Sequence, residues 1–170
     1  GRVPVNLNYT AHNDALASCA RQCNITQVLT SKKLIERLPI EVPGQSVYLE
    51  DIRESVSSKD RVIAMLMALL CPIWLLETLL GTRKRGIEDL GTIIFSSGSE
   101  GEPKGVMLTQ KNLIVNAFQV YETFPHDERT CIVGFLPFFH SFGYTVTLWL
   151  VAVWGLRAVY HSNPLEPKII

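Results

Sequence analysis

The sequence has 170 residues, of which 47% are hydrophobic and 19% are charged. This composition excludes an intrinsically disordered chain and provides enough apolar residues for one domain with its own core. The 16 basic and 16 acidic side chains cancel, so no excess positive charge favours nucleic acid as a partner.

Short extended and helical patterns alternate over the first sixty residues. Residues 3–8 are typical of the end of a strand, and apolar residues at helical spacing predict a helix over 11–23. Residues 25–30 and 46–50 are the next predicted strands, and a short helix between them begins after Ser31. This order of strands and helices predicts parallel pairing.

Residues 62–76 contain no charged side chain and lie between Arg61 and Glu77. The segment is short for a membrane-spanning helix and contains Pro72. One interpretation is a buried helix that is kinked at the proline. The other is a helix in a membrane interface, with the basic residues 83–85 near lipid head groups. The first is favoured, because apolar helices usually belong to the core.

Residues 92–106 combine an apolar strand with a loop suited to phosphate. The strand is predicted over 92–95, and residues 96–105 then contain three glycines, three serines and a lysine. Backbone N–H groups, hydroxyls and one positive charge converge in such a loop. The next helix is predicted over 109–124, with Thr109 as its N-cap and Leu108 and Leu113 as a hydrophobic staple.

Two common motifs are excluded for this loop. It is not a Walker A motif, because Pro103 stands where that motif has glycine and Gly105 follows Lys104 in place of a hydroxyl residue. It is not a hydrolase elbow either, because G-x-S-x-G is missing. The four cysteines lack metal-ligand spacing, so no metal site is predicted.

The last third of the sequence repeats the strand–helix–strand rhythm. Residues 131–136 form a continuous apolar run, as expected for a strand covered on both faces, and a helix over 141–154 precedes a strand over 156–160. The predicted fold class is therefore α/β, a doubly wound, mostly parallel sheet with helices on both faces. Ligands bind beyond the carboxyl ends of such strands, where the loop 96–105 and His140 would project.

His140 stands among aromatic residues. A histidine in that setting is usually a packed core residue, but its position just after a strand favours a place in a pocket.

The segment 96–106, Ser-Ser-Gly-Ser-Glu-Gly-Glu-Pro-Lys-Gly-Val, resembles the signature loop of the adenylate-forming superfamily, which includes acyl- and aryl-CoA synthetases, luciferases and peptide-synthetase adenylation domains. Three features are closer to its acyl-carrier-protein synthetase branch. They are Glu100 in place of the usual threonine, residues 7–11 (Leu-Asn-Tyr-Thr-Ala) and residues 137–143 (Pro-Phe-Phe-His-Ser-Phe-Gly). Together they resemble the synthetase half of the bifunctional 2-acylglycerophosphoethanolamine acyltransferase/acyl-ACP synthetases of bacterial inner membranes.

The resemblance extends over essentially the whole chain. It implies that residues 1–170 are one partial AMP-binding domain, a fragment of the large N-terminal domain, with the C-terminal lid domain absent. Residues 1–60 would be a first βαβ half, residues 61–90 an apolar helix and connection, and residues 91–170 the βαβ half with the phosphate loop.

The resemblance also implies an activity for the intact enzyme. A fatty acid would react with Mg-ATP to give acyl-adenylate, and the acyl group would then pass to the phosphopantetheine thiol of acyl carrier protein, or to coenzyme A. The magnesium-binding residue lies downstream in this family, so the fragment alone is expected to be inactive. An acyl-CoA or aryl-acid CoA ligase and a non-catalytic lipid- or nucleotide-binding relative remain alternatives. The expected location is the cytoplasmic side. A peripheral contact of residues 62–76 with the inner membrane belongs to the second, less favoured interpretation of that segment.

Individual roles follow from the same resemblance. Lys104 and His140 are the expected catalytic residues. The residues expected to bind the nucleotide are Ser96, Ser97, Gly98, Ser99, Glu100, Gly101, Pro103, Lys104 and Gly105. The residues expected to line the acyl pocket are Phe138, Phe139, His140, Phe142 and Gly143. The Glu100 carboxylate is unfavourable beside phosphates unless it points away or meets a cation.

Overall fold

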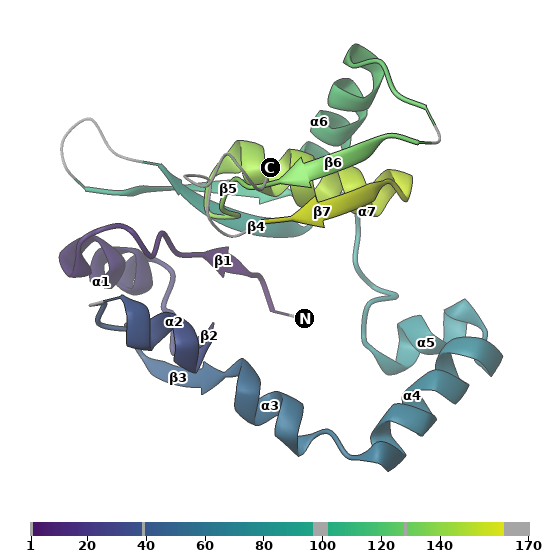
Figure 1. The fold of residues 1–170 in the computed structure, drawn as a ribbon, viewed down its shortest axis with the longest axis horizontal. Helices are drawn as coiled ribbons and strands as arrows, with labels where there is room; N and C mark the ends of the chain where they lie inside the picture. Colours follow the sequence, from purple (N-terminus) through teal and green to yellow (C-terminus); the bar gives the residue numbers. More distant parts are fainter. Residues whose placement is uncertain (1, 39, 97–101, 128, 162–170) are drawn as a thin grey trace. The chain divides into compact units, whose positions relative to one another are not determined.

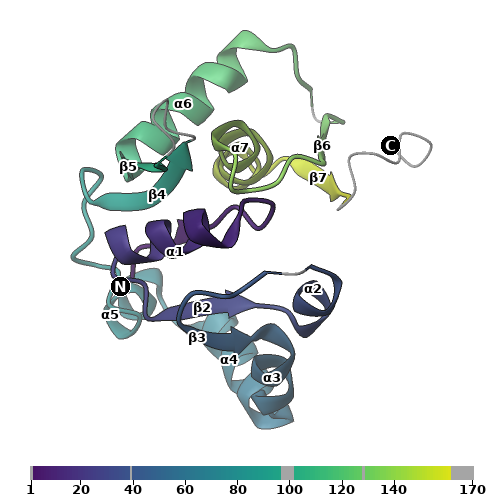
Figure 2. The same ribbon diagram turned by 90° about the vertical axis from the view of Figure 1, so that its left-hand side faces the viewer.

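The computed structural model describes residues 2–38, 40–96, 102–127 and 129–161. Strands and helices are interspersed along the chain (Figures 1 and 2), which confirms the α/β class. Within these ranges three of the four strand pairings are parallel, as predicted, and the strands are distributed over separate small sheets. The chain divides into two units, one comprising Tyr9–Arg85 and the other comprising Arg2–Asn8 and the chain from Gly86 onward.

The first unit begins with helix α1 (Asn13–Gln22), which buries Leu16, Cys19 and Ala20. Strand β2 (Gln27–Thr30) and strand β3 (Gln45–Tyr48) pair in parallel around helix α2 (Lys32–Arg37). This confirms the predicted strand–helix–strand order.

Strand β3 is shorter than predicted, because residues 49–50 already belong to helix α3 (Leu49–Ser55). Glu50 in its first turn accepts a hydrogen bond from the Ser31 hydroxyl at 2.7 Å and another from the Lys32 backbone N–H at 3.1 Å. These two bonds lower the pKa of Glu50 to about 2, since both donors stabilise the ionised carboxylate. Ser31 therefore bonds to α3 and makes no side-chain cap on α2.

Residues 62–76 form two helices. Helix α4 (Ser58–Leu70) begins with a capping box between Ser57 and Asp60, and helix α5 (Ile73–Leu79) follows Pro72. The prediction of one buried helix kinked at proline is wrong. Cys71 and Pro72 have extended backbone conformations that separate the helices, and neither helix has a buried side chain. Within the described ranges no helix combines the length and hydrophobicity needed to cross a membrane.

The second unit contains a sheet with the order β1, β4, β5. Strand β1 (Val5–Asn6) pairs in parallel with strand β4 (Leu90–Ser96), and strand β5 (Lys104–Thr109) pairs antiparallel with β4. Its place in the sequence predicts that β1 pairs with strands of the first half, and this prediction is wrong. Its actual partner is set by tertiary contacts, among them a hydrogen bond of 3.0 Å from the Thr92 hydroxyl to the Pro4 carbonyl.

Helix α6 (Gln110–Thr123) covers this sheet and supplies its core. The predicted N-cap is confirmed, because the Thr109 hydroxyl accepts from the Asn112 backbone N–H at 3.2 Å and the Asn112 side chain accepts from the Thr109 N–H at 2.9 Å. Leu113 is 1% exposed and packs with Ile94 and Tyr144, and Leu108 lies against this cluster as the staple requires.

Strand β6 (Cys131–Gly134) and strand β7 (Arg157–Tyr160) form a parallel pair. The connection between them is helical, as predicted, but Gly143–Trp149 forms a π-helix (η1) that continues into α7 (Leu150–Trp154). The prediction that β6 is covered on both faces is wrong for the described residues, because Cys131 and Val133 are exposed. In Figure 1 the arrows of β4 and β6 point toward the same side of this unit.

Candidate functional site

Lys104 and Gly105, predicted to lie in the loop before a helix, are the first two residues of strand β5. Lys104 is paired with Ser96 and Gly105 with Phe95 in the antiparallel ladder. The candidate phosphate segment therefore connects the two strands of a β-hairpin. The reason is that residues 104–109 satisfy their backbone groups by pairing with β4, and the helix begins only at the Thr109 cap.

Gly105 lies in close contact with side chains of the neighbouring strand. Its φ angle is not positive, contrary to the role suggested by a phosphate loop. A Cβ at this position would lie 3.2 Å from Ile93 Cγ2 and 3.2 Å from Phe95 Cε1 on the neighbouring strand. The glycine thus allows β4 and β5 to pack where the Phe95 ring covers the ladder.

The structure places both ends of the candidate phosphate segment. Ser96 is exposed at the end of β4, and its hydroxyl lies 3.5 Å from the Lys104 carbonyl oxygen, to which it donates. The Lys104 side chain is exposed at the start of β5, and Pro103 before it is half-buried. The five predicted residues between these ends lie outside the described part of the chain, so their roles remain predictions: Ser97, Gly98, Ser99, Glu100 and Gly101.

The second group of predicted residues lies between β6 and η1. The His140 backbone N–H donates to the Pro137 carbonyl at 3.1 Å, and the His140 carbonyl accepts from the Tyr144 N–H at 2.9 Å. These bonds hold a tight turn that leads into the helix. The imidazole is exposed, and its ring centroid lies 4.5 Å from that of Phe139, which is buried.

The predicted acyl-pocket residues divide by exposure. Phe138 is 39% and Phe142 58% exposed, so both rings offer apolar surface, whereas Phe139 supports His140 from the core. Gly143 is buried where the helix begins, and a Cβ there would lie 2.5 Å from the Pro137 carbonyl oxygen. Only glycine fits this contact between turn and helix.

The π-helix η1 is held by hydroxyl groups. The Thr147 hydroxyl donates to the Gly143 carbonyl at 2.6 Å, and the Tyr160 hydroxyl of β7 donates to the Thr147 carbonyl at 2.5 Å. These bonds satisfy carbonyl groups of the irregular turn. Through Thr147 they also connect Tyr160 of β7 to Gly143, which packs against the Pro137 carbonyl of the turn before His140.

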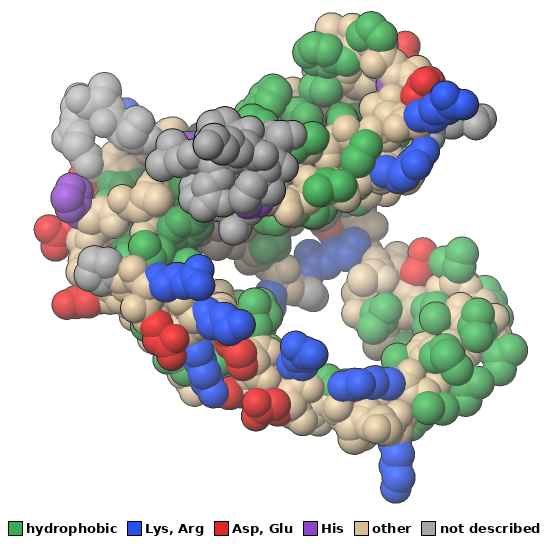
Figure 3. Space-filling view, in the orientation of Figure 1, with side chains coloured by type: hydrophobic (Ala, Val, Ile, Leu, Met, Phe, Trp, Pro, Cys, Tyr) green, Lys and Arg blue, Asp and Glu red, His purple; other side chains and the backbone are tan. Residues whose placement is uncertain are grey.

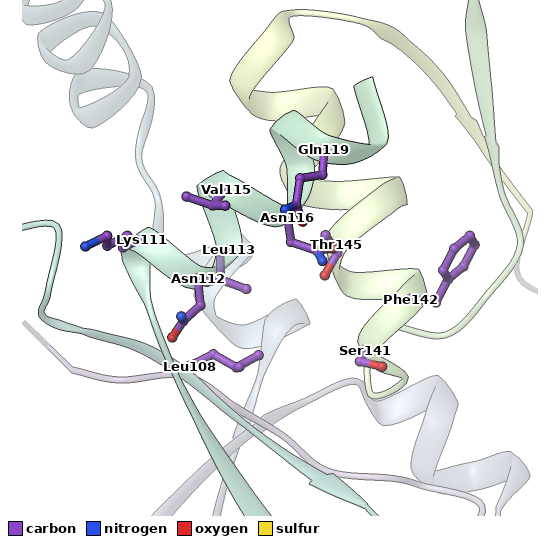
Figure 4. Close-up of a pocket in the computed structure, with 10 residues that line it drawn as sticks. All are labelled: Leu108, Lys111, Asn112, Leu113, Val115, Asn116, Gln119, Ser141, Phe142 and Thr145. Atoms are coloured by element: carbon purple, nitrogen blue, oxygen red, sulfur yellow. The ribbon is translucent and has the colours of Figure 1, made fainter. Parts of the chain in front are cut away.

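A groove of about 720 Å³ lies between α6 and the start of η1 (Figure 4). Phe142 is its only wall residue among the predicted acyl-pocket residues. In Figure 4 the side chains of Asn116 and Thr145 approach one another from the two helices, and Lys111 points away. Sequence reasoning missed the amides on α6. Their spacing at positions 112, 116 and 119, on one face of the predicted helix, was the available signal.

The structure assigns the two predicted catalytic residues to different parts of the second unit. Lys104 belongs to the sheet of β1, β4 and β5, and His140 follows β6 of the other sheet. Ser96 is the last residue of β4, and His140 lies in the turn that comes after β6. The two strands run in the same direction in Figure 1. Over the described ranges no cluster of three or more His, Cys, Asp or Glu side chains is arranged to hold a metal ion.

The sequence matches the family described as AMP-binding enzyme over residues 1–170. It is 45% identical over 56 residues, 33% of this chain and 9% of the relative, to the medium-chain-fatty-acid–[acyl-carrier-protein] ligase TtuA of Teredinibacter turnerae. It is 36% identical over 85 residues, 46% of this chain and 15% of the relative, to a long-chain-fatty-acid–CoA ligase of Haemophilus influenzae.

A structural likeness covers almost the whole chain. The o-succinylbenzoate coenzyme A synthetase of Bacillus subtilis, solved in complex with ATP and magnesium ion, superimposes with a TM-score of 0.69 over 97% of this chain and 30% of that chain. The identity is 17%, so this likeness establishes the fold alone. The chain therefore spans under a third of this protein and a smaller part of the two ligases.

Proposed function

This chain belongs to the family of AMP-binding enzymes, and we propose that its full-length protein activates a fatty acid with ATP and transfers the acyl group to the phosphopantetheine thiol of acyl carrier protein. The reaction would proceed through acyl-adenylate with release of pyrophosphate. Residues 1–170 would contribute the phosphate-binding hairpin and part of the acyl pocket.

The observation that carries this proposal is the β4–β5 hairpin. Ser96 and Lys104 face each other in the ladder at the point where the Gly- and Ser-rich segment begins and ends. A hydroxyl donor and a mobile ammonium group are thereby held on both sides of that segment. Both groups are exposed and suit phosphate oxygens.

The residues near His140 fit an acyl substrate. The exposed rings of Phe138 and Phe142 offer apolar surface, and the exposed imidazole of His140 lies beside Phe139. ATP supplies the activating phosphoryl group in this chemistry. The proposed work of the protein is to orient the carboxylate and to neutralise charge on the phosphates, and no covalent enzyme intermediate is needed.

The acceptor is the finer part of the proposal. Similarity to an acyl-carrier-protein ligase supports a carrier-protein thiol, and Glu100 and the motif over 137–143 point the same way. Similarity to a fatty-acyl-CoA ligase supports coenzyme A as the second candidate. Both acceptors use the same thiol chemistry, so the first half of the reaction does not distinguish them.

Fatty-acid-dependent exchange of pyrophosphate into ATP tests the first step in the full-length protein. Lys104→Ala is expected to lower this exchange by roughly 100-fold, because a positive charge at the phosphates is lost. Lys33→Ala removes an exposed lysine of α2 and serves as the matched control. Equal exchange rates in the two variants would contradict the assignment of Lys104.

The second step is tested by offering either thiol to the activated acid. Acyl transfer to phosphopantetheinylated acyl carrier protein in preference to coenzyme A is the expected result. Preference for coenzyme A would establish the second candidate, and absence of exchange with any fatty or aryl acid would support a non-catalytic relative. Residues 1–170 alone are expected to show no exchange.

A further inference from the structure

Helices α4 and α5 expose more apolar side chain than a solvated surface usually carries. We call residues 58–85 the α4–α5 segment. Ten of its large apolar side chains are exposed by 45% or more, and they are Val62, Ile63, Met65, Leu66, Leu69, Leu70, Ile73, Trp74, Leu79 and Leu80. Figure 3 shows hydrophobic side chains gathered over α4 and α5 at the lower right.

The distribution of these side chains distinguishes the segment from an ordinary amphipathic helix. A helix that packs one face on a protein has a polar opposite face. From Val62 to Leu70, α4 has no charged or polar side chain on any face, and no residue of α4 or α5 is buried. Such side chains are stabilised when they leave water, and the boundary between head groups and acyl chains of a bilayer is one environment that removes them from it.

The α4–α5 segment has a net positive charge, unlike the chain as a whole. It contains five basic and two acidic side chains, although the whole chain is neutral. The basic side chains are exposed at both ends of the apolar stretch, Lys59 and Arg61 before it and residues 83–85 after it. Such flanking charge complements anionic head groups. Trp74 lies in the first turn of α5, and its ring suits the boundary between head groups and acyl chains.

We propose that the α4–α5 segment binds the surface of an anionic lipid bilayer, with the side chains of Leu69, Leu70, Ile73 and Trp74 in the interface and Arg83, Lys84 and Arg85 at the head groups. The two helices lie in the membrane surface and do not cross it, in agreement with their lengths of 13 and 7 residues. This contact is separate from the proposed catalysis and places the protein next to its amphipathic substrate.

Hydrogen exchange of the full-length protein locates the contact. The expected result is slower exchange across the α4–α5 segment when vesicles of phosphatidylglycerol and phosphatidylethanolamine are added, with little effect of phosphatidylcholine vesicles. Protection that is already complete without vesicles would show that the remaining protein covers the segment. Protection that increases with protein concentration alone would show that a second copy of the protein covers the segment. Either result, or vesicle binding without protection here, overturns the proposal.

Variants then separate the contributions of charge and apolar surface. Replacing Arg83, Lys84 and Arg85 with Gln is expected to weaken binding to anionic vesicles by roughly 100-fold, at about fivefold for each charge. The matched control replaces Lys33, Arg37 and Arg53, which are exposed outside the segment.

The apolar variant replaces the two most exposed side chains of the segment, as Leu70→Gln and Ile73→Gln. It is expected to weaken binding by roughly 100-fold, with Leu29→Gln on β2 as an exposed control. The proposal fails if either variant binds anionic vesicles as tightly as its control.

Discussion

Gly143 offers a direct test of the packing that positions His140. A Cβ at this position would lie 2.5 Å from the Pro137 carbonyl oxygen, whereas real Cβ contacts essentially never fall below 3.0 Å. The turn or the helix must therefore move by about 0.5 Å. The obstructing atom belongs to the backbone, so no rotamer change relieves the contact. We expect Gly143→Ala to cost about 3 kcal/mol in local stability, the upper end for overpacking.

The same substitution should disturb the candidate site. The Pro137 carbonyl also accepts the His140 backbone N–H at 3.1 Å, so a displacement of this carbonyl moves the turn that carries the imidazole. Hydrogen exchange of the full-length protein measures the effect, and amides of residues 137–154 are expected to exchange roughly 100-fold faster. Fatty-acid-dependent pyrophosphate exchange is expected to fall in parallel.

Two other glycines provide graded controls. Gly86 has open space around its Cβ position and no positive φ, so Gly86→Ala is expected to change stability by less than about 0.5 kcal/mol. Gly155 also has open space, but its φ of 64° at the end of α7 predicts a cost of about 1 kcal/mol for alanine. If Gly143→Ala behaves like Gly86→Ala, the close contact does not position the turn and the reasoning is wrong.

Three further predictions concern helix capping, the core and acid stability. Thr109→Ala should cost about 1 kcal/mol and speed hydrogen exchange in the first turn of α6, because the cap is lost. Leu113→Ala should cost about 3 kcal/mol in urea unfolding, since the side chain is 1% exposed, whereas Val115→Ala at 45% exposure should change little. Glu50→Gln should destabilise the protein at pH 6. The difference in unfolding free energy between this variant and the wild type should become smaller as the pH falls. The depressed pKa contributes stability above the ordinary value of 4.5, and this contribution is lost toward about pH 2. Urea midpoints between pH 6 and pH 3 check this, with Glu36→Gln as the control, and a difference that does not vary with pH would contradict it.

Local chemistry in the sequence predicted several elements correctly. The Thr109 cap, the Leu108 and Leu113 staple and the parallel pair β2–β3 are present as expected. Each depends on residues within a few positions of one another or on a simple strand–helix–strand order. The family followed from the motif over 96–106 for the same reason, because it is a contiguous stretch of residues.

Strand β5 shows where local reasoning failed. A Gly- and Ser-rich stretch after an apolar strand predicts a loop before a helix, whereas in the structure the apolar run over 106–108 belongs to a returning strand. Two strands on either side of a Gly-containing connection are also a hairpin pattern. Whether the stretch forms a hairpin or a loop before a helix depends on whether β4 has a free edge for pairing. The sequence of the loop does not contain that information.

The amino-acid sequence by itself determined the family, the α/β class and the caps, since these depend on neighbouring residues and on periodicity. Only the tertiary structure decided that β1 pairs with β4, that Lys104 begins a strand and that α4 and α5 are exposed. The partner of β1 is about 88 residues away along the chain, and exposure depends on what packs against a helix. A local sequence pattern determines neither the partner of β1 nor the exposure of α4 and α5, because both depend on which of many competing long-range contacts are the most stable.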